Sequence, residues 1–387
     1  MAEERPSAGA AAPPEPSRTA LRELALLFLR LGLTAFGGPA AHVAMMQDEV
    51  VRRRGWLTTE ELLDFVGATN LIPGPNSTEL AIHIGHKRGG WRGLVVAGVC
   101  FIVPAALLSL GLAWFYVRYG KLPEARAILY GVKPVIIAVV AQALVALGRA
   151  ALKNRLVVAI GVAATVASLL HVDELVVLFG GGAAAMLGKP SNRLASGAPV
   201  AAIAGVLPAV SAGASPSSLF LAFAKIGSVL FGSGYVLLAF LRADFVERRG
   251  WLSEGQLIDA VAVGQVTPGP VFSTATFIGY LVAGLGGAAA STAGIFLPAF
   301  VFVALSGIIV PRLRRSPRAS LFLDGVNVAS LALMAVVTLD LTRAALVDAP
   351  ACGLAALSAL LLFRFEVSSA WLVLGGAAAG LALSFVR

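Results

Sequence analysis

The chain has 387 residues, of which 58% are hydrophobic and only 13% are charged, and its mean hydropathy is +0.86. Soluble globular domains carry about 25% charged residues, so the composition excludes a soluble enzyme and a disordered chain. The net charge of +9 lies mostly in short loops between apolar runs, which fits membrane topology and argues against nucleic-acid binding. We therefore expect an all-α polytopic membrane protein.

Residues 1–20 are rich in Ala, Pro, Glu and Ser, a composition typical of a disordered tail. A Ser-, Pro- and Gly-rich stretch over 189–218 is expected to be a linker between two domains, 21–188 and 219–387. Hydrophobic runs predict helical segments in chain order at Leu21–Phe36, Glu60–Leu71 and on to Gly85, Trp91–Val117, Ile128–Leu147, Leu156–Leu170, Leu175–Leu187, Leu219–Leu241, Leu257–Val282, Gly286–Val310, Leu321–Leu341, Ala344–Phe363 and Val367–Val386.

The two domains carry the same motifs in the same order, which indicates an internal duplication. The run Phe36-Gly37-Gly38 recurs 195 residues later as Phe231-Gly232-Ser233, and Pro73-Gly74-Pro75 recurs as Pro268-Gly269-Pro270. In each half a hydroxyl residue begins the helix before the PGP sequence. The sequences that follow Thr58 and Ser253 predict capping boxes there.

Loop charges predict that the two halves have opposite orientations in the membrane. The loop after the first PGP segment contains Lys87, Arg88 and Arg92, whereas the equivalent loop at 282–287 contains no charge. We expect five crossings per half, about ten in all, plus one PGP-broken re-entrant helical hairpin per half. This is an inverted-repeat plan of the kind that many secondary transporters use. The basic loop around Arg118 and Arg126 fits this scheme poorly, because the scheme places it outside.

Two cations at equivalent places lie within long apolar runs, Arg30 in the first half and Lys225 in the second. A cation at that depth costs at least roughly 2.5–3.5 kcal/mol, so it needs a partner. An anionic substrate would be one such partner. The alternatives are that each side chain reaches the interface or pairs with a carboxylate such as Glu49 or Asp244.

The paired PGP breaks predict a binding site, because irregular backbone at membrane depth is tolerated only where it is buried or lines a cavity. The helix that follows each break presents free amides and the positive end of its dipole, which suit an anion. The FGG-type runs are expected to unwind the first helix of each half and to face the other half's PGP segment; close helix packing is the alternative. The substrate-binding candidates are therefore Arg30, Lys225, Gly37, Gly38, Gly232, Ser233, Pro73, Gly74, Pro75, Asn76, Ser77, Thr78, Pro268, Gly269, Pro270, Ser273 and Thr274.

Three carboxylates are candidates for coupling transport to an ion: Glu79, Asp64 and Asp259. Glu79 precedes His83 and His86 on one helix face, but the adjacent Lys87 and Arg88 argue against a metal site. No P-loop, HExxH or GxSxG motif occurs in the sequence. We therefore expect no catalytic residues, no cofactor and no ATP hydrolysis in this chain, and an ion gradient or the membrane potential as the energy source.

The duplicated FGG, RRGWL and PGP series, followed by the spacing from Gly85 to Pro104, resembles the long, two-domain form of the chromate ion transporter family. The resemblance extends over nearly the whole chain from Leu21. It implies a multi-pass exporter in the inner (plasma) membrane that removes chromate and confers chromate resistance, with sulfate as a competing analogue. The halves differ at Asn76 and Val271, so the two half-sites are not equivalent.

Two other interpretations remain open at this point. The same fold could carry sulfate or another oxyanion, because chromate and sulfate are both tetrahedral dianions. An intramembrane enzyme acting on a lipid phosphate would need a nucleophile or a metal cluster, and only the Glu79 to His86 segment comes near to one. The sequence also leaves open whether the chain forms a homodimer.

Overall fold

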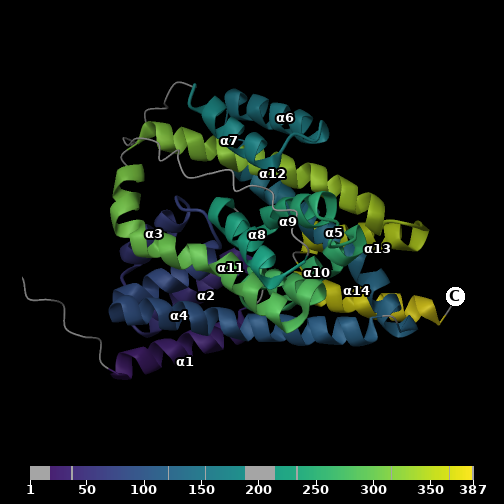
Figure 1. Cartoon of the computed structure of the whole chain (residues 1–387), viewed down its shortest axis with the longest axis horizontal. Helices are drawn as coiled ribbons and strands as arrows, with labels where there is room; N and C mark the ends of the chain where they lie inside the picture. Colours follow the sequence, from purple (N-terminus) through teal and green to yellow (C-terminus); the bar gives the residue numbers. More distant parts are fainter. Residues whose placement is uncertain are drawn as a thin grey trace, which may run out of the picture.

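The computed structural model describes residues 18–35, 38–120, 122–152, 154–187, 214–231, 234–314, 316–365 and 367–385. All regular structure in these ranges is helical (Figure 1). The first half contains α1 (Arg18–Thr34), α2 (Gly38–Gln47), the π-helix η1 (Asp48–Arg53), α3 (Thr59–Thr69), α4 (Asn76–Tyr119), α5 (Pro123–Ala151), α6 (Arg155–Leu169) and α7 (Glu174–Ala185). The second contains α8 (Pro216–Val229), η2 (Gly234–Val236), α9 (Leu237–Leu241), the π-helix η3 (Arg242–Arg248), α10 (Glu254–Val266), η4 (Val271–Ser273), α11 (Thr274–Arg314), α12 (Pro317–Ala345), α13 (Ala349–Phe365) and α14 (Ser369–Ser384).

Four helical segments of the described chain are long and apolar enough to cross a membrane: Asn76–Tyr119, Pro123–Ala151, Val271–Leu313 and Arg318–Ala345. Five shorter apolar helices accompany them. A helix of about 15 residues spans only about 22 Å, less than the roughly 30 Å of a bilayer's hydrocarbon core. The chain is thus an all-helical, multi-pass membrane protein.

The same local geometry occurs in both halves. Thr58 and Ser253 each accept a hydrogen bond from the third amide of the following helix, and Glu61 and Gln256 reach back to the capping residues, so both predicted capping boxes are confirmed. The glycine after each π-helix adopts a left-handed conformation with φ of 60°, at Gly55 and at Gly250. The duplication seen in the sequence is therefore also a duplication of backbone conformation.

The chain reverses direction inside α4 and inside α11. Gly90 takes φ of 55° and Gly284 takes φ of 60°, a region that glycine enters without strain. On either side of the first reversal, Gly85 and Gly93 pack backbone against backbone, leaving no room for a Cβ atom at either position. The segments on the two sides of each reversal therefore form a tight helical hairpin.

An ion pair closes a second hairpin in the first half. The ammonium group of Lys87, at the end of the first segment of α4, lies 3.0 Å from the carboxylate of Glu61 in the first turn of α3. The Thr58 amide and the Lys87 ammonium together lower the pKa of the Glu61 carboxyl. The chain thus runs along α3 to the PGP break and returns to its starting face.

Several predicted boundaries differ from the structure. The run predicted as one segment over Leu219–Leu241 is divided, because α8 ends at Val229 and helical structure resumes only at Gly234. The PGP sequence likewise divides the predicted segment Leu257–Val282 between α10 and η4. Most of the predicted tail and linker lies outside the described residues, although α1 begins at Arg18 and α8 at Pro216, inside the limits predicted for them.

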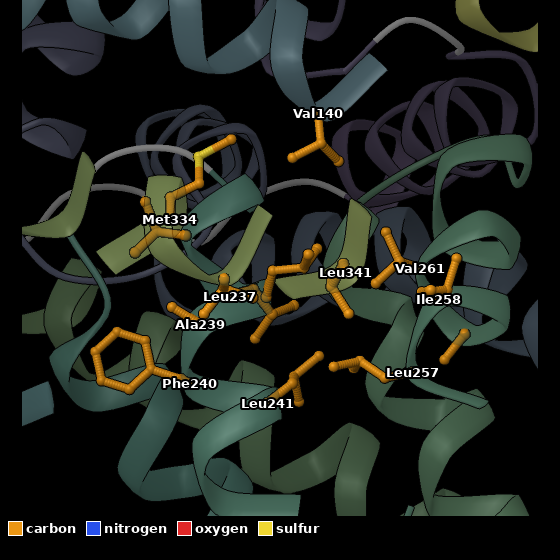
Figure 2. Packing of buried hydrophobic residues seen from close by; sticks show 14 of the residues in the cluster. Val140, Leu237, Ala239, Phe240, Leu241, Leu257, Ile258, Val261, Met334 and Leu341 are labelled. Atoms are coloured by element: carbon orange, nitrogen blue, oxygen red, sulfur yellow. The ribbon is translucent and has the colours of Figure 1, made fainter. Parts of the chain in front are cut away.

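Each half packs one of its long helices against helices of the other half. The long helix α5 of the first half packs against α13 and α14 of the second, and α12 packs against α6 and α7 of the first (Figure 1). Gly131 of α5 allows close contact with Gly376 and Gly380 of α14, while Gly181 of α7 meets Gly325 of α12. Small residues let helix backbones approach in this way within a membrane. The largest buried cluster accordingly mixes both halves: it contains Val140 of α5 together with Leu237, Ile258 and Met334 of the second half (Figure 2).

Candidate functional site

Each PGP break contacts the end of the first helix of the opposite half. The Gly74 amide donates a 2.8 Å hydrogen bond to the carbonyl of Leu230, just after α8. The Gly269 amide donates a 2.9 Å hydrogen bond to the carbonyl of Ala35, just after α1. Reciprocal contacts of this kind are what a pseudo-twofold axis produces. Gly37, Gly232 and Ser233, which follow these carbonyls, lie outside the described residues.

Glycine is required at the centre of both PGP turns. Gly74 has φ of 138° and Gly269 has φ of 88°, both unfavourable for residues with a Cβ atom. A Cβ atom on Gly269 would also approach the Ala105 side chain to 2.9 Å. The PGP turns are therefore fitted closely against their neighbours.

A small pocket lies where the two breaks meet, with a cavity volume of about 20 Å³. That is room for about one water molecule. Residues from both halves line it: His42, Pro75, Asn76, Ser77, Gly234, Pro270, Val271 and Phe272. The first turns of α4 and η4 begin at this pocket, so two helix N-termini with their unpaired amides converge on it.

Four residues of this lining are absent from the predicted substrate-binding candidates: Gly234, Val271, Phe272 and His42, of which only His42 has a titratable side chain. The Nε2 atom of His42 donates a 3.0 Å hydrogen bond to the carbonyl of Ala35, the same oxygen that accepts from Gly269. The second half has Leu237 at the equivalent position. A lone histidine within the apolar run 38–46 was the available signal.

The two cations predicted to lie within the membrane are outside the pocket lining and are paired with carboxylates. Arg30 forms an ion pair with Glu49, which also contacts Arg54 at 3.3 Å. Lys225 lies 3.9 Å from Asp244 at the equivalent place in the second half. In this structure each cation is therefore paired with a carboxylate, which is one of the alternatives that the sequence left open. About half of the Arg30 side chain remains exposed.

The predicted donors are distributed unequally. Asn76 and Ser77 line the pocket, as do Pro75 and Pro270. The hydroxyl of Ser273 instead accepts a 3.1 Å hydrogen bond from Ser109, and Thr274 donates to the Val271 carbonyl. The remaining described candidates lie outside the lining: Pro73, Gly74, Thr78, Pro268 and Gly269 are at the PGP turns or next to them in the chain, and Gly38 is at the start of α2.

The three carboxylates proposed for coupling occupy different environments. Asp64 is exposed on α3. Asp259 is buried on α10, where it accepts a 2.9 Å hydrogen bond from the Tyr116 hydroxyl and lies 3.4 Å from the Lys133 ammonium group. Glu79 is fully buried, and neither of its carboxylate oxygens has a hydrogen-bond partner among the described residues.

Broken helices that meet between two repeated halves, in an apolar all-helical chain, are features of a membrane transporter. The sequence profile of a family described as "Chromate transporter" matches residues 22–187 and again residues 217–381. The chain belongs to this family.

Individual relatives agree with the family match. The chain is 34% identical to the chromate transport protein of Cupriavidus metallidurans over 92% of each chain. It is 31% identical to the probable chromate transport protein of Synechococcus elongatus, over 85% of this chain and 86% of the relative. It is 32% identical to the chromate transport protein of Pseudomonas aeruginosa, over 82% and 80%. No solved structure matches the chain.

Proposed function

We propose that this protein is a secondary transporter that exports chromate across the inner membrane and thereby confers chromate resistance. The observation that carries the proposal is the convergence of two helix N-termini on one pocket, held there by the reciprocal hydrogen bonds of Gly74 and Gly269. The names of the relatives supply the substrate. Unpaired amides and helix dipoles suit an oxyanion, and Ser77 and Asn76 add side-chain donors.

The arrangement of charges supports inverted halves. Ion pairs of Lys87 with Glu61 and of Arg88 with Glu23 join the first reversal to the starts of α3 and α1 at one face. At the far end of α4, the Tyr116 hydroxyl donates a hydrogen bond to Asp259, about midway along α10. The two halves would then enter from opposite faces, with the basic reversal near Arg88 in the cytoplasm.

In this scheme the halves alternate access to the pocket by moving against one another. The present pocket is too small for a five-atom oxyanion, so binding requires the two PGP turns to separate. As the substrate passes, Arg30 would break its ion pair with Glu49, and Lys225 would break its ion pair with Asp244, so that both cations contact the anion. Expelling an anion runs with an inside-negative potential, worth about 2.3 kcal/mol per charge per 100 mV.

The same donor set would accept sulfate or another oxyanion, and sulfate is expected to compete with chromate. A lipid-phosphate enzyme is a weaker candidate, because no group of three metal-ligating side chains occurs in the described residues. A homodimer could transport either chromate or another oxyanion.

The deciding experiment is chromate uptake into inside-out vesicles containing the wild type, Arg30→Ala or Lys225→Ala. We expect wild-type uptake, sulfate inhibition and a large loss in both variants at normal expression. Absence of uptake by well-expressed wild type would refute the chromate proposal. Uptake unchanged in both variants would restrict the site to the PGP helix ends. Single cysteines placed near Arg88 and near Gly286 should react with a membrane-impermeant reagent from opposite sides; labelling from the same side would refute inverted halves.

A further inference from the structure

Three buried side chains directly behind the pocket lack hydrogen-bond partners within the described part of the chain. They are Thr78 through its hydroxyl, Glu79 through both carboxylate oxygens and His83 through Nε2. Thr78 and Glu79 are completely buried and His83 is 7% exposed. Glu79 and His83 are four residues apart and share a face of α4. Unsatisfied polar atoms at this depth are rare in folded proteins and call for a functional reason.

The fold itself does not require these groups, because the second half is built without them. Ser273 stands where the first half has Thr78, and its hydroxyl is hydrogen-bonded to Ser109. Thr274 stands where the first half has Glu79, and its hydroxyl donates to the Val271 carbonyl. At the same offset His83 corresponds to Ile278, and at the 194-residue offset that relates Gly85 to Gly279 it corresponds to Phe277; neither side chain carries a polar atom. These three groups thus occur in only the first of two otherwise matching helices; in the second, α11, the one buried side chain without a partner among the described residues is the Ser291 hydroxyl, further along the helix.

No cation neutralises Glu79 among the described residues. On the surrounding helices, Arg30, Lys87, Arg88 and Lys225 are paired with other carboxylates. Arg22 and Arg92 are exposed at helix ends. The other titratable groups with described side chains on the elements packed around Glu79 are Glu23, His42, Asp48, Glu49, Arg52, Arg53, Glu60, Glu61, Asp64, His83, His86, Cys100, Tyr116, Arg118, Tyr119, Glu254, Asp259, Tyr280 and Arg312. An isolated carboxylate buried without a counter-charge is strongly disfavoured, so the group at Glu79 holds a proton.

We propose that oxyanion binding at the pocket and protonation of Glu79 are positively linked, so that the anion enters the site together with a proton on this carboxyl. Asn76 and Ser77 line the pocket, and Glu79 follows within the same helical turn, about 3–5 Å further along the axis. An ionised Glu79 would repel a dianion at that range in a dry site. His83, one turn deeper, serves as the next proton-accepting group on the route from Glu79.

This inference rests on the proposed transport of oxyanions, and it specifies the coupling ion and the sign of the coupling. Linkage is reciprocal, so a bound anion raises the affinity for the proton just as the proton raises the affinity for the anion. A dianion accompanied by one proton carries one net negative charge. Its export therefore still runs with an inside-negative potential.

The test is chromate binding to the purified full chain at alkaline pH, where chromate is a dianion and its own protonation does not contribute to the proton count. Calorimetry in buffers of different ionisation heat gives the number of protons taken up. At pH values high enough for Glu79 of the free wild type to have lost its proton, we expect proton uptake on binding and an affinity that falls by up to about tenfold per pH unit; where Glu79 already holds its proton, we expect neither. Glu79→Gln, and Glu79→Thr, which introduces the residue type of the second half, should bind without proton uptake and without pH dependence. The matched control Glu60→Gln changes an exposed carboxylate on α3 and should behave as wild type.

A Glu79→Gln protein that keeps the wild-type pH slope and proton uptake would overturn the linkage. His83→Phe should keep the equilibrium linkage but slow proton exchange; an unchanged rate would remove His83 from the route. If wild type binds no chromate, the proposed chromate transport is refuted, and this result is distinct from a failure of the linkage between anion binding and protonation. The state of Glu79 is then read by infrared spectroscopy, which should show a protonated-carboxyl band in wild type that disappears in Glu79→Gln. Absence of this band from wild type would overturn the protonated carboxyl.

Discussion

The close crossing of Gly85 and Gly93 gives a prediction with a matched control in the same helix. A Cβ atom at Gly93 would lie 3.1 Å from the carbonyl carbon of Gly85, closer still to its oxygen, and 3.3 Å from the Leu24 side chain. The first obstacle is backbone, which cannot rotate away as a flexible side chain can. Overpacking of this kind costs about 1–3 kcal/mol, and we expect Gly93→Ala to lose that amount of stability.

Gly111→Ala provides the control. It lies in the same helix, and a Cβ atom there would have no neighbour within 4 Å. Alanine is favoured over glycine in a helix by up to about 1 kcal/mol, so this variant should be as stable as wild type or slightly more stable.

Thermal unfolding of the detergent-solubilised variants measures the difference. We expect a midpoint several degrees lower for Gly93→Ala and an unchanged or higher midpoint for Gly111→Ala. Gly287→Ala, at the equivalent crossing in the second half, should resemble Gly93→Ala. Equal midpoints for Gly93→Ala and Gly111→Ala would show that the hairpin crossing is not close-packed and would refute the reasoning.

Three further changes test other contacts. Thr58→Ala and Ser253→Ala each remove a capping box and should each lower unfolding free energy by about 1 kcal/mol; a loss in only one half would contradict their equivalence. Asp259→Ala leaves the Lys133 charge without its carboxylate and should cost about 2–3 kcal/mol, part of which the added Lys133→Ala restores; strictly additive losses in this double-mutant cycle would contradict the ion pair. Arg248→Gln breaks contacts to Asp173 and Glu174 of the other half and to the buried Asp244, so it should cost about 1–3 kcal/mol, and the part due to the exposed Asp173 should shrink in high salt; a wholly salt-independent loss would contradict an electrostatic contact with Asp173.

Much of the architecture could be predicted from the sequence, because its causes are local. Hydropathy gave the membrane class, and the recurrence of PGP and FGG-type motifs gave the duplication. The capping boxes at Thr58 and Ser253 were predictable, because a hydroxyl residue followed three positions later by Glu or Gln satisfies its own helix end. The breaks at Pro73–Pro75 and Pro268–Pro270 followed from the covalent geometry of proline.

The site itself depended on contacts between residues far apart in the chain. From the sequence, Arg30 and Lys225 could either bind the substrate or form ion pairs with carboxylates. Only the packing of α1 and α8 showed that Glu49 and Asp244 lie beside them. No local signal specified that α5 and α12 each pack against helices of the other half, because an apolar helix face suits any apolar partner of matching shape.

Tertiary structure alone also decided which of the three carboxylates stands apart. Asp64, Glu79 and Asp259 all occupy helices of similar composition, and their sequence neighbours do not reveal their burial or their partners. The fold exposes Asp64, gives Asp259 a tyrosine and a lysine from other helices, and encloses Glu79 without any partner from the described segments. The electrostatic energy of a charge is set by the solvent and counter-charges around it, and those surroundings exist only once distant segments have packed together.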